Sequence, residues 1–204
     1  MRICFLGDSF VNGVGDDTCL GWVGRTCAAA RKQGHDMTAY NLGVRGDTSA
    51  DIAVRWLREA ELRLPANHDG RLVFSFGTND CCPGEDGQPR VPHARGVENA
   101  QAILSAATAW LPTLMIGPLP VCDDAATDGR VRDLSRAFGK VCAQLGVPYL
   151  DVFPAMTSCD AWRREAASGD GAHPNSGGYA ALAGLIGDWA AWRAWLEMKH
   201  PDSD

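Results

Sequence analysis

A serine, a histidine and an aspartate are spaced so that they could act together in nucleophilic catalysis. Ser9 follows Gly7 and Asp8 in a short motif near the start of the chain. A serine hydroxyl is a weak nucleophile until a base removes its proton, and His173 is the best candidate base among the five histidines. Asp170 lies three residues earlier, where its carboxylate can accept the Nδ1 proton and stabilise the imidazolium. These residues predict a Ser-His-Asp triad.

Other residues could stabilise the oxyanion that forms when a serine attacks a carbonyl group. Such a charge needs donors that are in place where it develops. Gly46 lets a backbone N–H approach a ligand closely, and the Asn79 amide can donate from the next strand end. The Ser9 N–H, at a helix entrance, is a third candidate. We therefore predict an oxyanion hole formed by Ser9, Gly46 and Asn79.

Each feature also has a purely structural interpretation. Ser9 alone is a good helix N-cap, and an isolated Gly-Asp-Ser sequence is usually a turn. His173 before Pro174 could begin a helix, and Asn79 with Asp80 could form an Asx turn. Catalysis is favoured because nucleophile, base, orienting acid and oxyanion donors all occur in one predicted topology.

The elements that must position these residues alternate along the chain. Short apolar runs predict five buried strands, at 2–6, 38–42, 72–76, 113–116 and 147–152. Apolar residues at helical spacing predict helices between them, one of which buries Ala53, Leu57, Ala60 and Leu64. The alternation predicts an α/β protein with a five-stranded parallel sheet covered on both faces. Ligands of such sheets bind at the carboxyl ends of the strands, where the candidate residues lie.

Four sequence blocks resemble those of the SGNH, or GDSL-type, hydrolases. They are Gly7-Asp8-Ser9-Phe10, Asn41-x-Gly-x-x-Gly46, Gly77-x-Asn79-Asp80 and Asp170-x-x-His173-Pro174, and their order and spacing extend over almost the whole chain. The resemblance implies one flavodoxin-like, three-layer α/β/α domain over residues 1–204. It also implies hydrolysis of a carboxylic ester or thioester through an acyl-enzyme intermediate, without cofactor or metal. The resemblance implies that Ser9 is the nucleophile, His173 the base, Asp170 the acid that orients it, and Gly46 with Asn79 the oxyanion donors. These are the roles that their chemistry also suggests.

Substrate choice is predicted to depend on residues near these blocks and on loops 81–92 and 119–127, which carry glycine, proline and acidic residues. The predicted substrate-binding residues are Phe10, Asp47, Cys81 and Pro120. Phe10 replaces the leucine of the family motif and is also expected to pack beneath the catalytic turn. No clear apolar docking patch is evident, which favours a small, soluble, short-chain ester over a lipid surface.

The eight cysteines include no Cys-x-x-Cys motif and no Cys/His cluster with zinc-ligand spacing, so we expect no metal site. Several fall in apolar patterns, where a reduced thiol acts as a small hydrophobic group. The adjacent Cys81 and Cys82 follow the oxyanion asparagine and are predicted to line the acyl pocket or its rim. A redox switch is the alternative.

Charge and hydropathy argue against nucleic acid and membranes as partners, which leaves a small-molecule ester as the expected partner. Nineteen Lys and Arg against twenty-five Asp and Glu give a net charge of −6 without clustered cations, so nucleic acid is not expected to bind. No segment approaches the ~20 apolar residues that span a bilayer, and no signal peptide is evident, which predicts a cytoplasmic protein without stable membrane association. The tail from about residue 198 is expected to fray.

A predicted last helix ends in three tryptophans. Its apolar positions are Tyr179, Leu182, Ile186, Trp189, Trp192 and Trp195. Packing in the core is the first interpretation of the tryptophans. A homodimer interface is the alternative, because a three-residue step turns the stripe by about 60° each time, beyond what one buried face needs.

Three other functions stay open at this stage. An acyltransferase that uses a hydroxyl acceptor shares the acyl-enzyme step with a hydrolase. Gly13 and Gly15 after the first strand suggest a phosphate-binding module, but glycines at 7, 13 and 15 match neither Gly-x-Gly-x-x-Gly nor a P-loop. A non-catalytic binding protein on the same fold is disfavoured because every catalytic block is intact.

Overall fold

The computed structural model describes residues 1–198, so almost all of the tail that was predicted to fray lies outside the described residues. One sheet is formed by β1 (Arg2–Gly7), β2 (Thr38–Gly43), β3 (Gly70–Ser75), β4 (Thr113–Ile116) and β5 (Tyr149–Leu150). All neighbours are parallel, in the order β2-β1-β3-β4-β5. This is the flavodoxin-like strand order, which confirms the predicted fold class.

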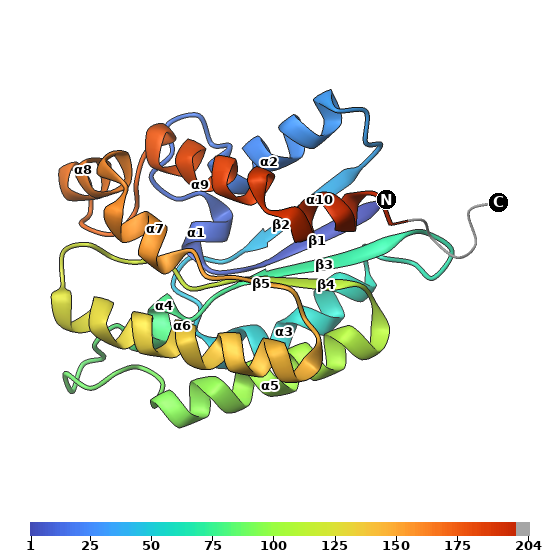
Figure 1. Ribbon diagram of the computed structural model, residues 1–204. Coiled ribbons are helices and arrows are strands. Elements are labelled where there is room, and N and C mark those ends of the chain that lie inside the picture. Colours follow the sequence, from blue (N-terminus) through green and yellow to red (C-terminus); the bar gives the residue numbers. More distant parts are fainter. Residues whose placement is uncertain (199–204) are drawn as a thin grey trace.

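Helices cover both faces of the sheet (Figure 1). One layer contains α1 (Ser9–Asn12), α2 (Gly21–Lys32), α8 (Asp160–Ser168), α9 (Ser176–Asp188) and α10 (Ala190–Leu196). The other contains α3 (Ser49–Glu61), α4 (Thr78–Cys81), α5 (His93–Trp110) and α6 (Ala125–Leu145). Helix α7 (Phe153–Ser158) contacts both α6 and α8. No helix in residues 1–198 has the length and apolar character needed to cross a membrane.

Alternating side chains of β1, an interior strand of the sheet, contribute to two separate cores. Cys4 and Leu6 of β1 pack with α3, α5 and α6, whereas Ile3 and Phe5 pack with α2, α9 and α10. All four are fully buried. Successive side chains of a strand point to opposite faces, so a strand covered on both sides must be apolar throughout. This explains why the strands appear in the sequence as continuous apolar runs.

The buried face of α3 differs from the prediction. Leu57 is 42% exposed and Ala53 is also exposed, while Ile52 and Trp56 are buried. The other two predicted positions, at 60 and 64, are buried as expected. The neighbouring row of the helix faces the sheet because it carries the larger side chains, and Trp56 packs edge-on against Phe74 of β3 at 5.5 Å between ring centroids.

The predicted last strand and last helix are both shorter in the structure. Pro148, inside the predicted strand at 147–152, has no N–H to donate, and Asp151 leaves the sheet to accept the Phe153 N–H at 3.2 Å. The predicted last helix breaks at Trp189, which has an extended backbone between α9 and α10. Trp192 and Trp195, only 3% and 4% exposed, stack on each other inside the core, as the first interpretation of the tryptophans expected.

Candidate active site

Three candidate catalytic side chains meet at the carboxyl edge of the sheet. Ser9 begins α1 directly after β1, and Asp170 and His173 lie in the loop between α8 and α9. Ser9 Oγ lies 2.7 Å from His173 Nε2, and His173 Nδ1 lies 2.7 Å from Asp170 Oδ2. A nucleophile, a base and a group that orients the base are thus connected by short hydrogen bonds. This arrangement can move a proton from the serine hydroxyl to the imidazole.

The turn that carries Ser9 is built around a buried acid. Asp8 is 2% exposed and caps α1, since its Oδ1 accepts the Phe10 N–H at 3.0 Å. Burial is the main cause that raises the pKa of Asp8 to about 7; the hydrogen bond from the Phe10 N–H opposes it, and the nearby Asp80 and Asp47 add to it. Sequence analysis missed this property, because burial of a motif residue is not visible in its type.

The Asp170 carboxylate is held in place by its own loop. Its Oδ1 accepts the backbone N–H of His173 at 2.9 Å and that of Ala172 at 3.1 Å. Burial raises the pKa of Asp170, but the hydrogen bonds from His173 and Ala172 outweigh it and bring the pKa to about 2. Arg45 Nη2 lies 3.3 Å from Oδ2. The acid is therefore ionised and can stabilise a protonated His173.

Two residues after β1 fit closely against the histidine loop. The Phe10 ring lies 4.8 Å from the His173 ring and stacks on Trp162 at 5.7 Å. Gly15 has φ +88°, and a Cβ there would lie 2.7 Å from the Pro174 carbonyl oxygen and 3.0 Å from the His173 Cβ. Gly15, first considered as part of a phosphate loop, instead leaves room for the loop that carries the base.

The candidate oxyanion donors are neighbours in space. Gly46, with φ +87°, occupies the third position of a turn closed by the Asp47 N–H and the Val44 carbonyl at 3.2 Å. The Asn79 Nδ2 donates to the Asp47 carbonyl at 3.0 Å. Within residues 1–198, the Gly46 N–H has no protein acceptor. This donor and the second amide hydrogen of Asn79 are thus available to a ligand.

The four residues predicted to bind substrate are occupied by internal contacts instead. Phe10 and Cys81 are 3% and 5% exposed, and Pro120 is buried with its carbonyl accepting the Trp162 Nε1–H at 3.3 Å. The Asp47 carboxylate accepts the Nε–H of Arg55 at 2.6 Å. These side chains are therefore engaged in packing and hydrogen bonds within the protein. The sequence predicted that they lie near the site, but it does not show in which direction each side chain points.

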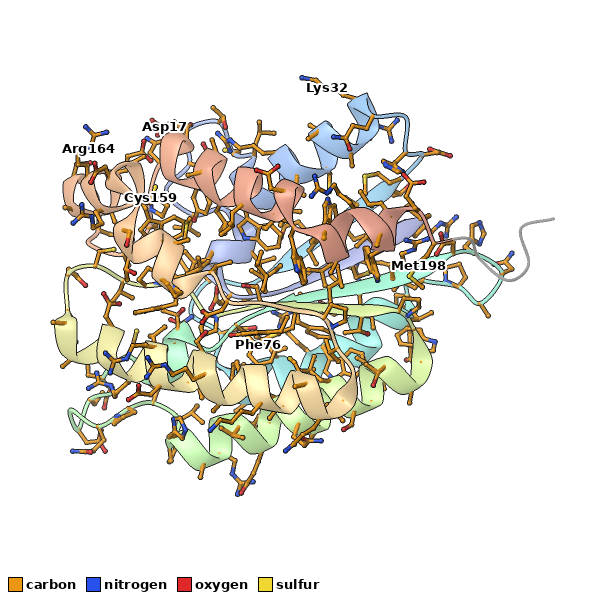
Figure 2. The ribbon with its side chains drawn as sticks, in the orientation of Figure 1. Asp17, Lys32, Phe76, Cys159, Arg164 and Met198 are labelled. Carbon is orange, nitrogen blue, oxygen red and sulfur yellow. The ribbon has the colours of Figure 1, made fainter. Side chains whose placement is uncertain are left out.

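An open crevice lies beside the imidazole instead. It has a volume of about 470 Å³ and is lined by Val14, Gly15, Asp17, Arg45, Glu165, Ser168, Gly169, Asp170, His173 and Asn175. Figure 2 shows Asp17 at the end of the molecule where α8 lies, far from Met198. Most of these side chains are polar. The sequence analysis did not identify Asp17, Arg45 or Asn175. Asp17 and Asn175 lie outside the four family blocks, and Arg45 occupies an unspecified position of the second block.

The adjacent cysteines are protonated thiols. Burial raises the pKa of Cys81 to about 12 and also raises the pKa of Cys82. Redox-sensing cysteines instead have low pKa values and are accessible. Cys81 lines a separate cavity of about 110 Å³ with Asp80 and Leu134, and none of the three candidate catalytic residues is part of its lining. In residues 1–198, no three His, Cys, Asp or Glu side chains are grouped closely enough to hold a metal ion.

The sequence profile of the GDSL-like lipase/acylhydrolase family matches residues 5–181. The chain belongs to this family. Its members hydrolyse esters, so this GDSL-family protein is an ester-hydrolysing enzyme. No curated protein sequence matches the chain.

Solved structures share the fold of this GDSL-family protein. A lipase/acylhydrolase from Enterococcus faecalis is 24% identical over 91% of this chain and 92% of its own, with a TM-score of 0.72. Axe2, an acetylxylan esterase from Geobacillus stearothermophilus, is 14% identical over 97% and 94%, with a TM-score of 0.72. LAE5, an alpha/beta hydrolase from the metagenome of Lake Arreo, Spain, is 18% identical over 97% and 96%, with a TM-score of 0.71.

Proposed function

We propose that this GDSL-family protein is a serine esterase that cleaves a small carboxylic ester through an acyl-enzyme intermediate. The observation that carries the proposal is the unbroken chain of hydrogen bonds from Ser9 Oγ through His173 to Asp170, with both links at 2.7 Å. A serine that served only as a helix cap would not need a histidine aligned on its hydroxyl.

In the proposed reaction, Ser9 Oγ attacks the ester carbonyl carbon while His173 Nε2 takes the hydroxyl proton. The carbonyl oxygen becomes an oxyanion, which accepts hydrogen bonds from the Ser9 and Gly46 N–H groups and the Asn79 amide. The intermediate collapses, the bond to the alcohol oxygen breaks, and His173 returns its proton to that oxygen. Water then repeats the sequence on the acyl-enzyme, which releases the acid and restores Ser9. Asp170 stabilises the imidazolium in both halves.

The crevice indicates which part of the substrate is polar. Because His173 Nε2 gives its proton to the leaving oxygen, the alcohol must lie beside the imidazole, where the crevice opens. Its lining includes Asp17, Arg45 and Asn175, which can hydrogen-bond to hydroxyl groups. We therefore propose an ester of a small acyl group with a polar alcohol. The acetylxylan esterase among the similar structures supports this choice.

Hydrolysis of p-nitrophenyl esters from acetate to palmitate tests the proposal. We expect the wild type to be most active on the shortest acyl chains, and Ser9→Ala to lose about 10³-fold or more in kcat. Ser105→Ala on α5 is the matched control and should retain full activity. Circular dichroism shows whether each variant is folded. A folded Ser9→Ala protein with the wild-type rate would disprove the mechanism, and product formed only with an added alcohol would favour the acyltransferase.

A further inference from the structure

We propose that Arg55 is a positioning residue that sets the geometry of the oxyanion hole, an inference that rests on the proposed function. Arg55 lies on α3, and its side chain is 18% exposed. Its Nη2 donates to the Gly7 carbonyl at 2.8 Å, and its Nη1 donates to the Leu42 carbonyl at 3.0 Å. Its Nε donates to the Asp47 carboxylate at 2.6 Å. One guanidinium group thus connects three separate segments.

Each of these segments carries or supports an oxyanion donor. Gly7 ends β1 two residues before Ser9, and its carbonyl also accepts the Val44 N–H at 3.0 Å. Asp47 follows Gly46 directly, so holding its side chain fixes the turn that presents the Gly46 N–H. The Asp47 carbonyl accepts the Asn79 amide at 3.0 Å, which passes the same constraint to the next donor.

The chemistry of the guanidinium group suits this task. It is planar, always charged, and presents several N–H donors in a rigid fork. Two strand-end carbonyls and a mostly buried carboxylate, 15% exposed, fix that plane from three directions. Lysine could not make these bonds together, because its ammonium is a compact point charge on a flexible chain.

A second contact, a hydrogen bond between Ser49 and Asp80, connects α3 to the segment that carries Asn79. Asp80, 1% exposed, accepts the Ser49 N–H at 2.7 Å through Oδ1. Ser49 is the first residue of α3, and Asp80 follows Asn79 in α4. The helix that presents Arg55 is therefore held to the helix that presents Asn79. Misalignment of one donor should disturb the others.

Arg71 provides a matched control, because it is a buried arginine with comparable bonds far from the site. It lies in β3, pairs with Asp69 at 2.7 Å, and donates to the carbonyls of Trp195 and Met198. Met198 lies at the end of the molecule opposite Asp17 (Figure 2). Loss of Arg71 should lower stability without altering the oxyanion donors.

The experiment compares the kinetics of Arg55→Met, Arg55→Lys and Arg71→Met on p-nitrophenyl acetate, well below each melting temperature. We expect Arg55→Met to lose about 10²-fold in kcat with KM changed less than about threefold, because misplaced donors weaken the transition state rather than substrate binding. Arg55→Lys should recover part of the loss. Arg71→Met should keep its kcat within about twofold of the wild type.

Combining Arg55→Met with Asn79→Ala shows whether Arg55 acts through the oxyanion hole. If it does, the double variant loses much less than the product of the two single losses. Independent, multiplying losses, or a wild-type kcat in folded Arg55→Met, would overturn the inference. Should Arg55→Met not fold, Arg55→Lys takes its place in the same cycle. Failure of the proposed function is distinguished by Ser9→Ala, which would then match the wild type whatever Arg55 does.

Discussion

Asp8 and Asp170 are two aspartates of one site whose surroundings shift their pKa values in opposite directions. Asp8 is buried beneath the serine turn with one N–H donor, and its pKa is raised to about 7. Asp170 is bonded by two backbone N–H groups and the His173 ring, and its pKa falls to about 2. At neutral pH the second carboxylate is fully ionised and the first is near its midpoint. Only the second is suited to stabilise an imidazolium.

Replacement of Asp8 by asparagine should remove a pH dependence of stability. The folded pKa of Asp8, about 7, lies above its usual value near 3.8, so the folded state binds this proton more tightly than the unfolded state. Its contribution is fully present below about pH 4 and is lost as the pH rises through 7. We expect Asp8→Asn, which keeps an oxygen to cap Phe10, to be more stable than wild type at pH 8.

Urea unfolding of both proteins at pH 5 and pH 8 measures this effect. The difference in unfolding free energy should be largest at pH 8 and should shrink at pH 5, where Asp8 of the wild type is mostly protonated. A difference that is equal at both values would mean that Asp8 does not titrate in this range.

The side chains that meet at the candidate site could be predicted from sequence, whereas the residues that support them could not. Ser9, Asp170 and His173 were candidates because a nucleophile, a base and an orienting acid each require a particular side chain, and the structure brings the three together. Arg55 was not found, since nothing in the sequence shows that an arginine on a helix reaches the ends of two strands. The orientation of Cys81 likewise depends on packing between elements.

At the scale of elements, the site depends on the close fit between the segment after β1 and the loop before α9. Gly15 lies in the first and contacts His173 and Pro174 in the second. Neither segment belongs to a strand or a long helix, so their mutual contact replaces the support that regular structure gives. Gly15 thus leaves room for the loop that positions His173, the proposed base.

Gly15→Ala should therefore lower the catalytic rate of protein that is still folded. Alanine at positive φ costs about 1–2 kcal/mol, and its Cβ would also press against the His173 loop. The matched control is Gly34→Ala, because Gly34 has φ +99° with nothing within 4 Å of a Cβ. In thermal unfolding we expect Gly34→Ala to lose the cost of the positive φ alone, and Gly15→Ala to lose more because of the added contact with the His173 loop. Only Gly15→Ala should lose activity, by roughly tenfold or more; equal activity in the two variants would contradict this account.

Element types were easier to predict than the faces and ends of the elements. The five strands appear as apolar runs because both faces of the sheet are covered. The prediction of the buried face of α3 was wrong because Ile52 and Leu57 are both apolar and lie in different rows of the helix. The packing of Trp56 against Phe74 of β3 selects the row that is buried, and this contact cannot be read from the sequence. The break at Trp189 follows Gly187 and Asp188, but a single glycine inside a helical pattern does not by itself show where a helix ends.

At the scale of the whole molecule, Arg71 joins the sheet to the last helix. Its side chain is 2% exposed, its guanidinium lies over the Trp195 ring at 5.1 Å, and it donates to carbonyls at the end of α10. Arg71→Met leaves these carbonyls and Asp69 without a partner, which should cost about 3 kcal/mol. For a domain of this size the melting temperature should fall by roughly 6–12 °C in differential scanning calorimetry. An unchanged melting temperature would show that α10 is held by its tryptophans alone.

The interior position of β1 in the sheet also matters while the chain is being synthesised. β1 lies between β2 and β3, so its second neighbour does not exist until residue 75 has been synthesised (Figure 1). At about 5–20 residues per second, β1 spends several seconds without that neighbour, with one apolar edge open to chaperones or to other nascent chains. His173 reaches Ser9 only after residue 173 has emerged, so a stalled or truncated chain carries the proposed nucleophile without its proposed base.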